Sequence, residues 1–200
     1  MNELKKIADF LQLYREIYGD SLTYDRQRIA TLAGQMPEFI LENSNSDDQS
    51  QTHPLWEYKS TIENCRKCPL WKTRKNFVFG DGNPQADLLF VGEAPGAEED
   101  KSGIPFVGRA GKLLNQLLAH INLKREEVFI ANILKSRPPG NRDPLPEEVE
   151  ACIPYLHRQI ELIRPAVMVA LGRIAAQNLL NTKDSLKNMR ARKWTYQGVP

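Results

Sequence analysis

From residue 86 onward, short apolar runs alternate with amphipathic stretches, and this alternation is the strongest constraint on the fold. The apolar runs are predicted to be buried strands: ADLLFVGEA (86–94), EVFIANILK (127–135) and AVMVALG (166–172). The stretches between and after them are predicted to be helices: GKLLNQLLAHI (111–121), PEEVEACIPYLHRQIELI (146–163) and one beginning with RIAAQNLL (173–180). Strands that alternate with helices favour a parallel sheet covered on both faces. We therefore predict an α/β fold.

Two of the predicted helices carry further signals. The leucine-rich helix is expected to turn one apolar side to the sheet: Leu113, Leu114, Leu117, Leu118 and Ile121. The helix over 146–163 starts with a proline, has glutamates in its first turn and is followed by Pro165. Each of these features is typical of a helix terminus.

The N-terminal part has a different character. Apolar residues at helical spacing in 2–18, and a second short stretch before Pro37, predict a small helical appendage over 1–42. Residues 43–54 are polar and predict a flexible linker, which leaves 55–200 as the main domain. The apolar side of the predicted helix in 2–18 is expected to pack within the appendage, although it would also suit a protein partner.

Charge and hydropathy limit the function classes. Residues 1–64 hold six Lys and Arg against eleven Asp and Glu, whereas 65–200 hold 21 against 14, so a polyanion partner is expected for the second part. A solvated surface would also explain so modest an excess. No apolar run approaches the roughly 20 residues that cross a bilayer. The N-terminus lacks a signal-peptide core, and we expect a cytoplasmic protein.

The loops that follow the predicted strands are the expected ligand sites, because α/β proteins bind ligands beyond the carboxyl ends of parallel strands. The loop after the first strand, GEAPGAEEDKSGIPFVG, matches neither phosphate-cradling motif: G-x-G-x-x-G is absent, and Arg109 stands where a P-loop has lysine. The first loop offers Glu93, Glu99, Asp100 and Phe106. A nucleotide phosphate is therefore not the expected ligand.

The second strand suggests a flat, uncharged ligand. Asn132 ends this strand and offers an amide edge, while Phe106 offers a ring face on which a heterocycle can stack. Together they match what a flipped nucleobase requires. Nearby cations would then suit the flanking phosphates: Lys135, Arg137 and Arg142. The simpler alternatives are that Asn132 satisfies backbone at a strand end and that Phe106 belongs to the core.

These segments carry a resemblance to a known family. FGDGNPQADLLFVGEAPGAEEDKSGIPFVGRAGKLL, followed by ANILKSRPPGNRDPLPEEVEAC, resembles the family 4 uracil-DNA glycosylases, the iron–sulfur branch of that superfamily. The resemblance runs from about Cys65 to Pro200. It implies a three-layer α/β/α fold with a central parallel four-stranded sheet. It also implies a monomer that acts on uracil-containing DNA, hydrolysing the N-glycosidic bond of deoxyuridine to leave an abasic site.

The resemblance also assigns roles to residues around the base. Glu93 and the backbone of Ala94 would lie beside the uracil and the attacking water, and these two with Asn132 would form the catalytic set. Phe106 would stack on the base, and Asn132 would accept from its ring N–H and donate to its O4. Ala94 has no side chain to act as a base, so much of the rate would come from orienting water and stabilising the departing anion.

Three further positions belong to the same implied site. Glu99 and Asn141 would brace the loops around the pocket. Gly96 stands where the better-known family 1 enzymes carry a bulky aromatic residue that blocks thymine. Small residues at 94 and 96 would let the backbone approach the ligand closely.

The cysteines depart from the family pattern. Cys65 and Cys68 form a C-x-x-C pair, and Cys152 lies in the helix over 146–163, but Ser136 stands at the third of the four expected ligand positions. A hydroxyl is a harder and weaker ligand for iron than a thiolate. The resemblance implies a 4Fe-4S cluster held by the three cysteines with Ser136 or water. A labile, three-iron or absent cluster remains an alternative, as do three thiols without metal.

The second catalytic motif of the family, a histidine-proline pair followed by a leucine-arginine loop, would fall after Pro200. On this view the sequence holds a domain truncated before that motif. His53, His120 and His157 do not stand where they would substitute, and the last two are expected at the surface. A glycosylase-like module that binds DNA or protein without chemistry is therefore the alternative function, and a small zinc or redox protein is a third.

Overall fold

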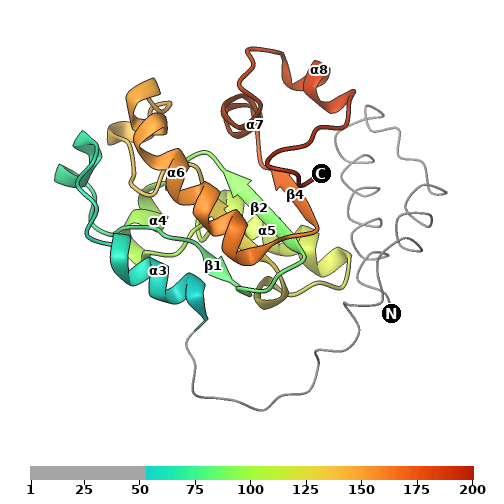
Figure 1. Ribbon diagram of the computed structural model, residues 1–200, viewed down its shortest axis with the longest axis horizontal. Helices are drawn as coiled ribbons and strands as arrows, with labels where there is room; N and C mark the ends of the chain where they lie inside the picture. The colour runs from blue at the N-terminus through green and yellow to red at the C-terminus, as the bar shows by residue number, and fades with distance from the viewer. Residues whose placement is uncertain (1–52) are drawn as a thin grey trace.

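The structure is a computed structural model that describes residues 53–200 (Figure 1). The helical appendage predicted over 1–42, and most of the linker predicted over 43–54, lie outside the described residues. The linker prediction is wrong at its last two positions. His53 is the N-cap of helix α3 (Pro54–Ile62), whose Leu55 N–H donates to His53 Nδ1 at 3.1 Å, and Pro54 is the first helical residue.

A four-stranded sheet in the order β1-β3-β2-β4 forms the centre of the molecule. Strand β2 (Leu88–Gly92) is fully buried and pairs in parallel with both β3 (Phe129–Asn132) and β4 (Val167–Ala170). The prediction of an α/β fold with four strands is confirmed. Each of the three apolar runs contains one of these parallel strands, so their carboxyl ends meet at one edge of the sheet.

The prediction that all four strands are parallel is wrong. Strand β1 (Asp81–Gly82) pairs with β3 in the antiparallel direction. It is two residues long and contains no apolar run that periodicity could detect. Gly82 has a φ of +120°, and a Cβ there would lie 2.0 Å from the carbonyl oxygen of Val128, so the close pairing at this edge requires glycine.

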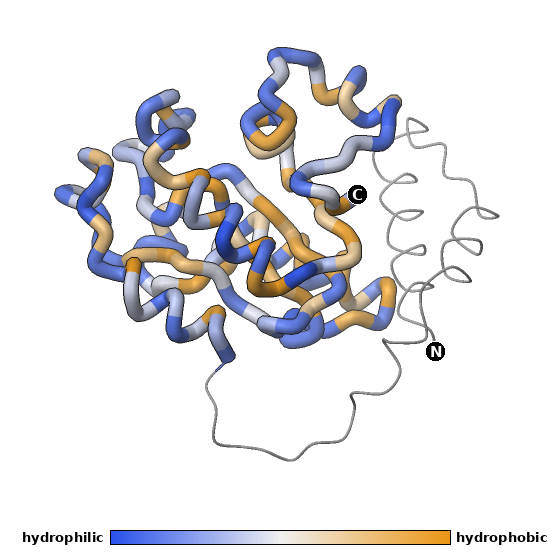
Figure 2. The backbone as a smooth tube through the Cα atoms, viewed as in Figure 1, coloured by the Kyte–Doolittle hydropathy of each residue, from blue (hydrophilic) through white to orange (hydrophobic). Residues whose placement is uncertain are grey.

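Two apolar clusters cover the two faces of the sheet and make the three layers. Leu88 and Phe90 point to the face packed by α5 (Arg109–His120), where Leu114, Leu118 and Ile121 are buried. Leu89 and Val91 point to the opposite face. Figure 2 shows these apolar strands running between the helices. Leu113 is 46% exposed, so the prediction that it belongs to the buried apolar side of α5 is wrong.

The second face is covered by α3, by α6 (Pro146–Ile163) and by α7 (Arg173–Leu180). The bounds of α6 agree with the prediction. Short elements complete the described chain: α4 (Ala97–Ser102), α8 (Leu186–Arg190) and the 3-10 turns Pro69–Lys72, Arg125–Glu127 and Pro139–Asn141. In residues 53–200, no helix is long and apolar enough to span a membrane.

Candidate functional site

Three groups converge at the carboxyl ends of β2 and β3. Gly92, the last residue of β2, is paired with Asn132, the last residue of β3. A Cβ placed on Gly92 would lie 2.3 Å from Asn132 Oδ1 and 2.6 Å from the ring atoms Cε2 and Cζ of Phe106. The amide and the ring that the sequence singled out are therefore neighbours, and both approach Gly92 so closely that any side chain there would clash with them.

The amide of Asn132 is buried and unpaired. The residue is 1% exposed, and neither Oδ1 nor Nδ2 has a hydrogen-bond partner among the described residues. This excludes the simpler explanation in which Asn132 satisfies backbone at the strand end. Leaving a buried polar group without a partner costs about 1–3 kcal/mol, so such groups call for an explanation. An external molecule with one donor and one acceptor would satisfy both atoms.

The backbone of Phe106 is held in place by Arg125. Its φ is +52°, in the left-handed region, and its carbonyl accepts a hydrogen bond from Arg125 Nη1 at 3.1 Å. Arg125 Nη2 donates to the carbonyl of Pro105, and Arg125 Nε donates to Asp81 Oδ2 at 3.2 Å. A Cβ on Gly111 would lie 1.8 Å from the Phe106 carbonyl oxygen. These contacts fix the backbone that carries the Phe106 ring.

Gly92, Gly111 and Arg125 also belong to this site and were not predicted from the sequence. A glycine inside an apolar helical stretch, as in GRAGKLL, was a usable sign of close backbone approach at Gly111. Arg125 gave no sign, because its partners lie 19 and 20 residues away in the chain.

Glu99 braces the loop that carries Phe106. Its carboxylate accepts backbone hydrogen bonds from Gly96 N at 3.1 Å, Val107 N at 3.0 Å and Gly108 N at 2.8 Å. It thereby joins the start of α4 to the start of α5. Asn141 is exposed and lies on a different loop, where its Oδ1 accepts from Arg137 Nε at 2.7 Å.

Glu93 and Ala94 follow directly after β2, and both are half-buried. Burial raises the pKa of the Glu93 carboxyl group, and the nearby charge of Asp143 raises it further. Arg173, at the start of α7, lowers this pKa and so opposes both effects. The Glu93 carbonyl accepts from Leu134 N at 3.0 Å, which ties this position to the chain just beyond β3.

The predicted phosphate-binding cations do not form one surface. Lys135 is fully buried and therefore cannot face DNA, so its assignment as a phosphate contact is wrong. Burial lowers the pKa of its ammonium group to about 7. Arg142 is committed to Glu148 by two bonds of 2.9 and 2.6 Å, because the buried Glu148 carboxylate at the start of α6 needs a partner. Arg137 is half-buried beside Asn141.

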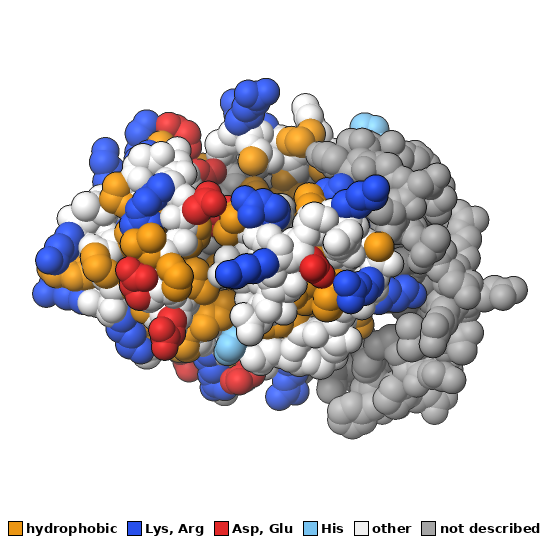
Figure 3. Space-filling view, turned by 90° about the horizontal axis from the view of Figure 1, so that it is seen from above, with side chains coloured by type: hydrophobic (Ala, Val, Ile, Leu, Met, Phe, Trp, Pro, Cys, Tyr) orange, Lys and Arg blue, Asp and Glu red, His pale blue; other side chains and the backbone are white. Residues whose placement is uncertain are grey.

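Other cations lie beside the Phe106 loop. A groove of about 660 Å³ runs along the start of α5, and its lining includes the exposed residues Lys101, Arg109 and Lys112 together with Val107 and Gly108. Lys101 is paired there with Glu98 at 2.9 Å. Figure 3 shows Lys and Arg side chains spread over one face of the molecule, with hydrophobic side chains between them.

The three cysteines lie near one another. Cys65 is half-buried, while Cys68 and Cys152 are buried, and all three are free thiols. Burial raises the pKa of the Cys152 thiol to about 11, and the charges of Cys68 and Cys65 raise it as well. Cys65 Sγ accepts from the Tyr155 hydroxyl at 3.0 Å. The thiols are thus within electrostatic reach of each other.

Ser136 does not complete a four-thiolate set. Its buried hydroxyl accepts a hydrogen bond from Arg74 Nη1 at 3.1 Å. Across the described part of the chain, no group of three or more His, Cys, Asp or Glu side chains is arranged to hold a metal ion. The described residues therefore place the three cysteines near one another but do not arrange them as a metal site, and the hydroxyl of Ser136 is engaged by Arg74.

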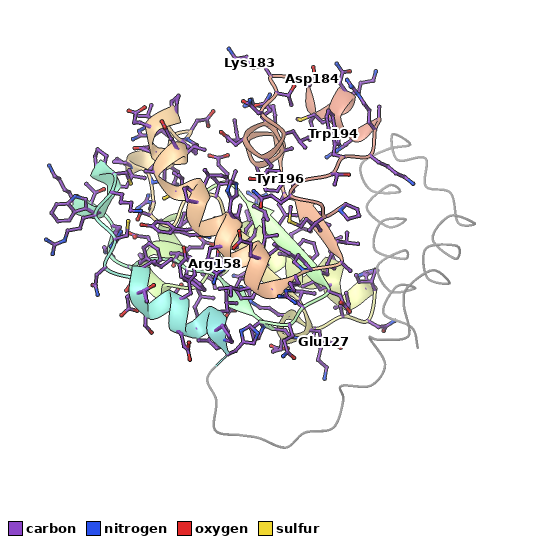
Figure 4. The ribbon with its side chains drawn as sticks, viewed as in Figure 1. Glu127, Arg158, Lys183, Asp184, Trp194 and Tyr196 are labelled. Atoms are coloured by element: carbon purple, nitrogen blue, oxygen red, sulfur yellow. The ribbon has the colours of Figure 1, made fainter. Side chains whose placement is uncertain are left out.

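The histidines lie elsewhere in the fold. His120 is exposed at the end of α5, as predicted. His157 is half-buried and its Nε2 is hydrogen-bonded to the Tyr196 hydroxyl, so its prediction as a surface residue is wrong. Tyr196 is labelled in Figure 4 and packs against the apolar cluster that includes α6. His53 caps α3.

Comparison with known proteins gives one consistent family. Residues 79–198 match the uracil DNA glycosylase superfamily. The chain is 61% identical over 123 residues to the type-4 uracil-DNA glycosylase of Archaeoglobus fulgidus, covering 62% of each protein. It is 51% identical over 140 residues to that of Saccharolobus solfataricus, covering 68% of this chain and 65% of the relative. The matched part thus spans under two thirds of these relatives.

The raised pKa of Glu93 yields a prediction about stability. A carboxyl group with a raised folded-state pKa favours its neutral form, so its contribution to stability is lost as pH rises through that pKa. Glu93→Gln, which is permanently neutral, should therefore raise the melting temperature slightly at pH 7. The gain should disappear below the ordinary carboxyl pKa of 4.5. Thermal unfolding followed from pH 4 to 8 measures this, and an equal effect at every pH would contradict it.

Proposed function

The chain belongs to the uracil DNA glycosylase superfamily, and we propose that it removes uracil from DNA by hydrolysing the N-glycosidic bond of deoxyuridine. One observation carries the proposal: the buried, unpaired amide of Asn132 lies beside the ring of Phe106 at the carboxyl edge of the sheet. The type-4 relatives support the same activity.

Uracil matches the polar pattern of this amide. Its N3–H would donate to Asn132 Oδ1, and its O4 would accept from Asn132 Nδ2, so both orphaned atoms gain a partner at once. The uracil ring would stack on Phe106, whose backbone is fixed by Arg125. Reaching such a pocket requires a nucleotide that is flipped out of the helix or already single-stranded.

In the reaction, the bond from the sugar carbon C1′ to uracil N1 breaks and uracil takes the electron pair. A water oxygen forms the new bond to C1′, and the water proton ultimately neutralises the base. Negative charge spreads onto O4 as the bond breaks, so the Asn132 Nδ2–H bond becomes stronger in the transition state than in the ground state. Glu93 and the backbone of Ala94, directly after β2, would orient the attacking water.

The groove at the start of α5 offers a path for the DNA strand. It adjoins the loop that carries Phe106, and Lys101, Arg109 and Lys112 line it. Phosphate contacts of this kind hold a strand in register without reading its sequence. Arg137, which follows Asn132 in the loop after β3, is a further candidate for a phosphate contact.

We propose that Cys65, Cys68 and Cys152 hold an iron–sulfur cluster through three thiolates, with Ser136 as a weak fourth neighbour. The mutual proximity of the thiols supports this, while the Arg74–Ser136 hydrogen bond argues against a fourth strong ligand. The cluster would stabilise the segment that precedes β1 and its contact with α6. No step of base removal depends on it in this scheme.

The principal alternative is a module of the same fold that binds uracil-containing DNA without cleaving it. The pocket would be the same in both cases, so only release of the base separates them. The family's catalytic histidine has no counterpart among residues 53–200, because His157 is hydrogen-bonded to Tyr196 and His53 caps the start of α3. The alternative therefore needs a direct test of base release.

The first test of the proposed function is Asn132→Asp. The carboxylate cannot donate to O4 and would repel the developing charge, so uracil release from a deoxyuridine oligonucleotide should fall about a hundredfold or more. Asn122→Asp makes the same chemical change at an exposed position just after α5 and should stay within a few-fold of the unsubstituted chain. Salt-dependent DNA binding should be similar in both. Equal release by Asn132→Asp would contradict the pocket assignment.

The second test concerns the cysteines. Protein purified without oxygen should contain iron and absorb near roughly 400 nm. Ser136→Cys should raise the iron content and slow its loss to a chelator, because a thiolate binds iron more strongly than a hydroxyl. Iron-free protein that is folded, with no gain from Ser136→Cys, would contradict the cluster.

A further inference from the structure

Lys135 is an unusual side chain in this fold because its charge is fully enclosed. It is 0% exposed, and its Nζ donates to the backbone carbonyl of Asn132 at 2.7 Å and to Gln159 Oε1 at 2.6 Å. Burial of an ammonium group carries a large desolvation penalty unless partners compensate for it. An apolar side chain of similar length would fill the same space without that penalty.

The hydrogen bond from Lys135 Nζ to the Asn132 carbonyl bridges the turn that follows β3. Lys135 lies three residues after Asn132, and the intervening Ile133 and Leu134 donate their N–H groups to the carbonyls of Gly92 and Glu93. The turn after β3 is therefore held both by the Lys135 side chain and by backbone hydrogen bonds to the chain after β2. Its first residue is Asn132, whose side-chain amide has no partner among the described residues.

Lys135 is itself anchored by other parts of the fold. Its carbonyl accepts from Val78 N at 2.8 Å, and its own N–H donates to the Cys152 thiol on α6. Gln159, also on α6, holds the ammonium group on one side and donates through Nε2 to the Phe79 carbonyl at 2.9 Å on the other. The ammonium group thus ties Asn132 to α6 and to the segment before β1.

We propose that Lys135 is a positioning residue that holds the backbone of Asn132 so that its amide stays aimed at the uracil edge. The inference rests on the proposed function, because it assigns a role in the same site. It explains why the fold encloses a charge next to an unpaired amide: the amide has no partner of its own in the described structure, so its direction depends on the backbone that carries it.

The experiment compares Lys135→Met with Leu156→Ala. Leu156 is fully buried on α6 in the apolar cluster of that face, which includes neither Lys135 nor Asn132, so its truncation should destabilise the fold without altering the contacts of the amide. Leu156→Ala should lower the melting temperature, and Lys135→Met should lower it less because it removes an enclosed ammonium group. Only Lys135→Met should lower kcat for uracil release, by about tenfold to a hundredfold, because small misplacements of a reacting group cost that much. KM for the oligonucleotide should change little.

A second readout does not depend on activity. In protein labelled with ¹⁵N at asparagine, the side-chain NH₂ signals of Asn132 should shift or broaden in Lys135→Met and stay in place in Leu156→Ala. If no form of the chain releases uracil while these signals still move, the proposed function fails and the positioning role stands. Should Lys135→Met not fold, Gln159→Leu, which removes one anchor of the ammonium group, should move the same signals.

Two results would overturn the proposal. One is a kcat for Lys135→Met equal to that of Leu156→Ala at matched stability. The other is an unchanged Asn132 side-chain spectrum in a folded Lys135→Met protein. Either would mean that the enclosed ammonium group serves only the fold.

Discussion

The parallel pairing of β2 with β3 is the constraint on which the site depends. Its register sets Gly92 opposite Asn132 at the last rung of the ladder, so a residue without a side chain faces an amide at the edge of the sheet. A slip of one residue would turn every side chain of a strand to the other face and remove this match. The two apolar clusters that cover the sheet prevent such a slip, because Leu88 and Phe90 must face α5 while Leu89 and Val91 face α6.

Several features around this edge oppose stability. The Asn132 amide is unpaired, the ammonium group of Lys135 is enclosed, the pKa of Glu93 is raised, and Phe106 has a left-handed backbone. Features of this kind concentrate at functional sites, where the surrounding structure keeps them in place. Here Arg125, Glu99 and Gln159 supply that support through hydrogen bonds to backbone or to Lys135.

Much of this arrangement could be predicted from the sequence, because it follows from local patterns. The three apolar runs gave the parallel strands, and the proline and glutamates before EACIPYLHRQIELI gave the start of α6. Strand β1 could not be predicted, since two residues with glycine carry no periodicity. The roles of Arg125 and Lys135 could not be predicted either, because they depend on partners far away in the sequence: the Phe106 carbonyl for Arg125 and the Gln159 side chain for Lys135.

A crystal structure of the chain grown with free uracil would show directly whether the Asn132 amide reads the base. We expect uracil against the Phe106 ring, with N3 about 2.9 Å from Asn132 Oδ1 and O4 about 2.9 Å from Asn132 Nδ2. Both orphaned atoms would then be satisfied. Uracil bound elsewhere, or an Asn132 amide that stays unpaired at saturating uracil, would contradict the claim that this amide exists to read the base.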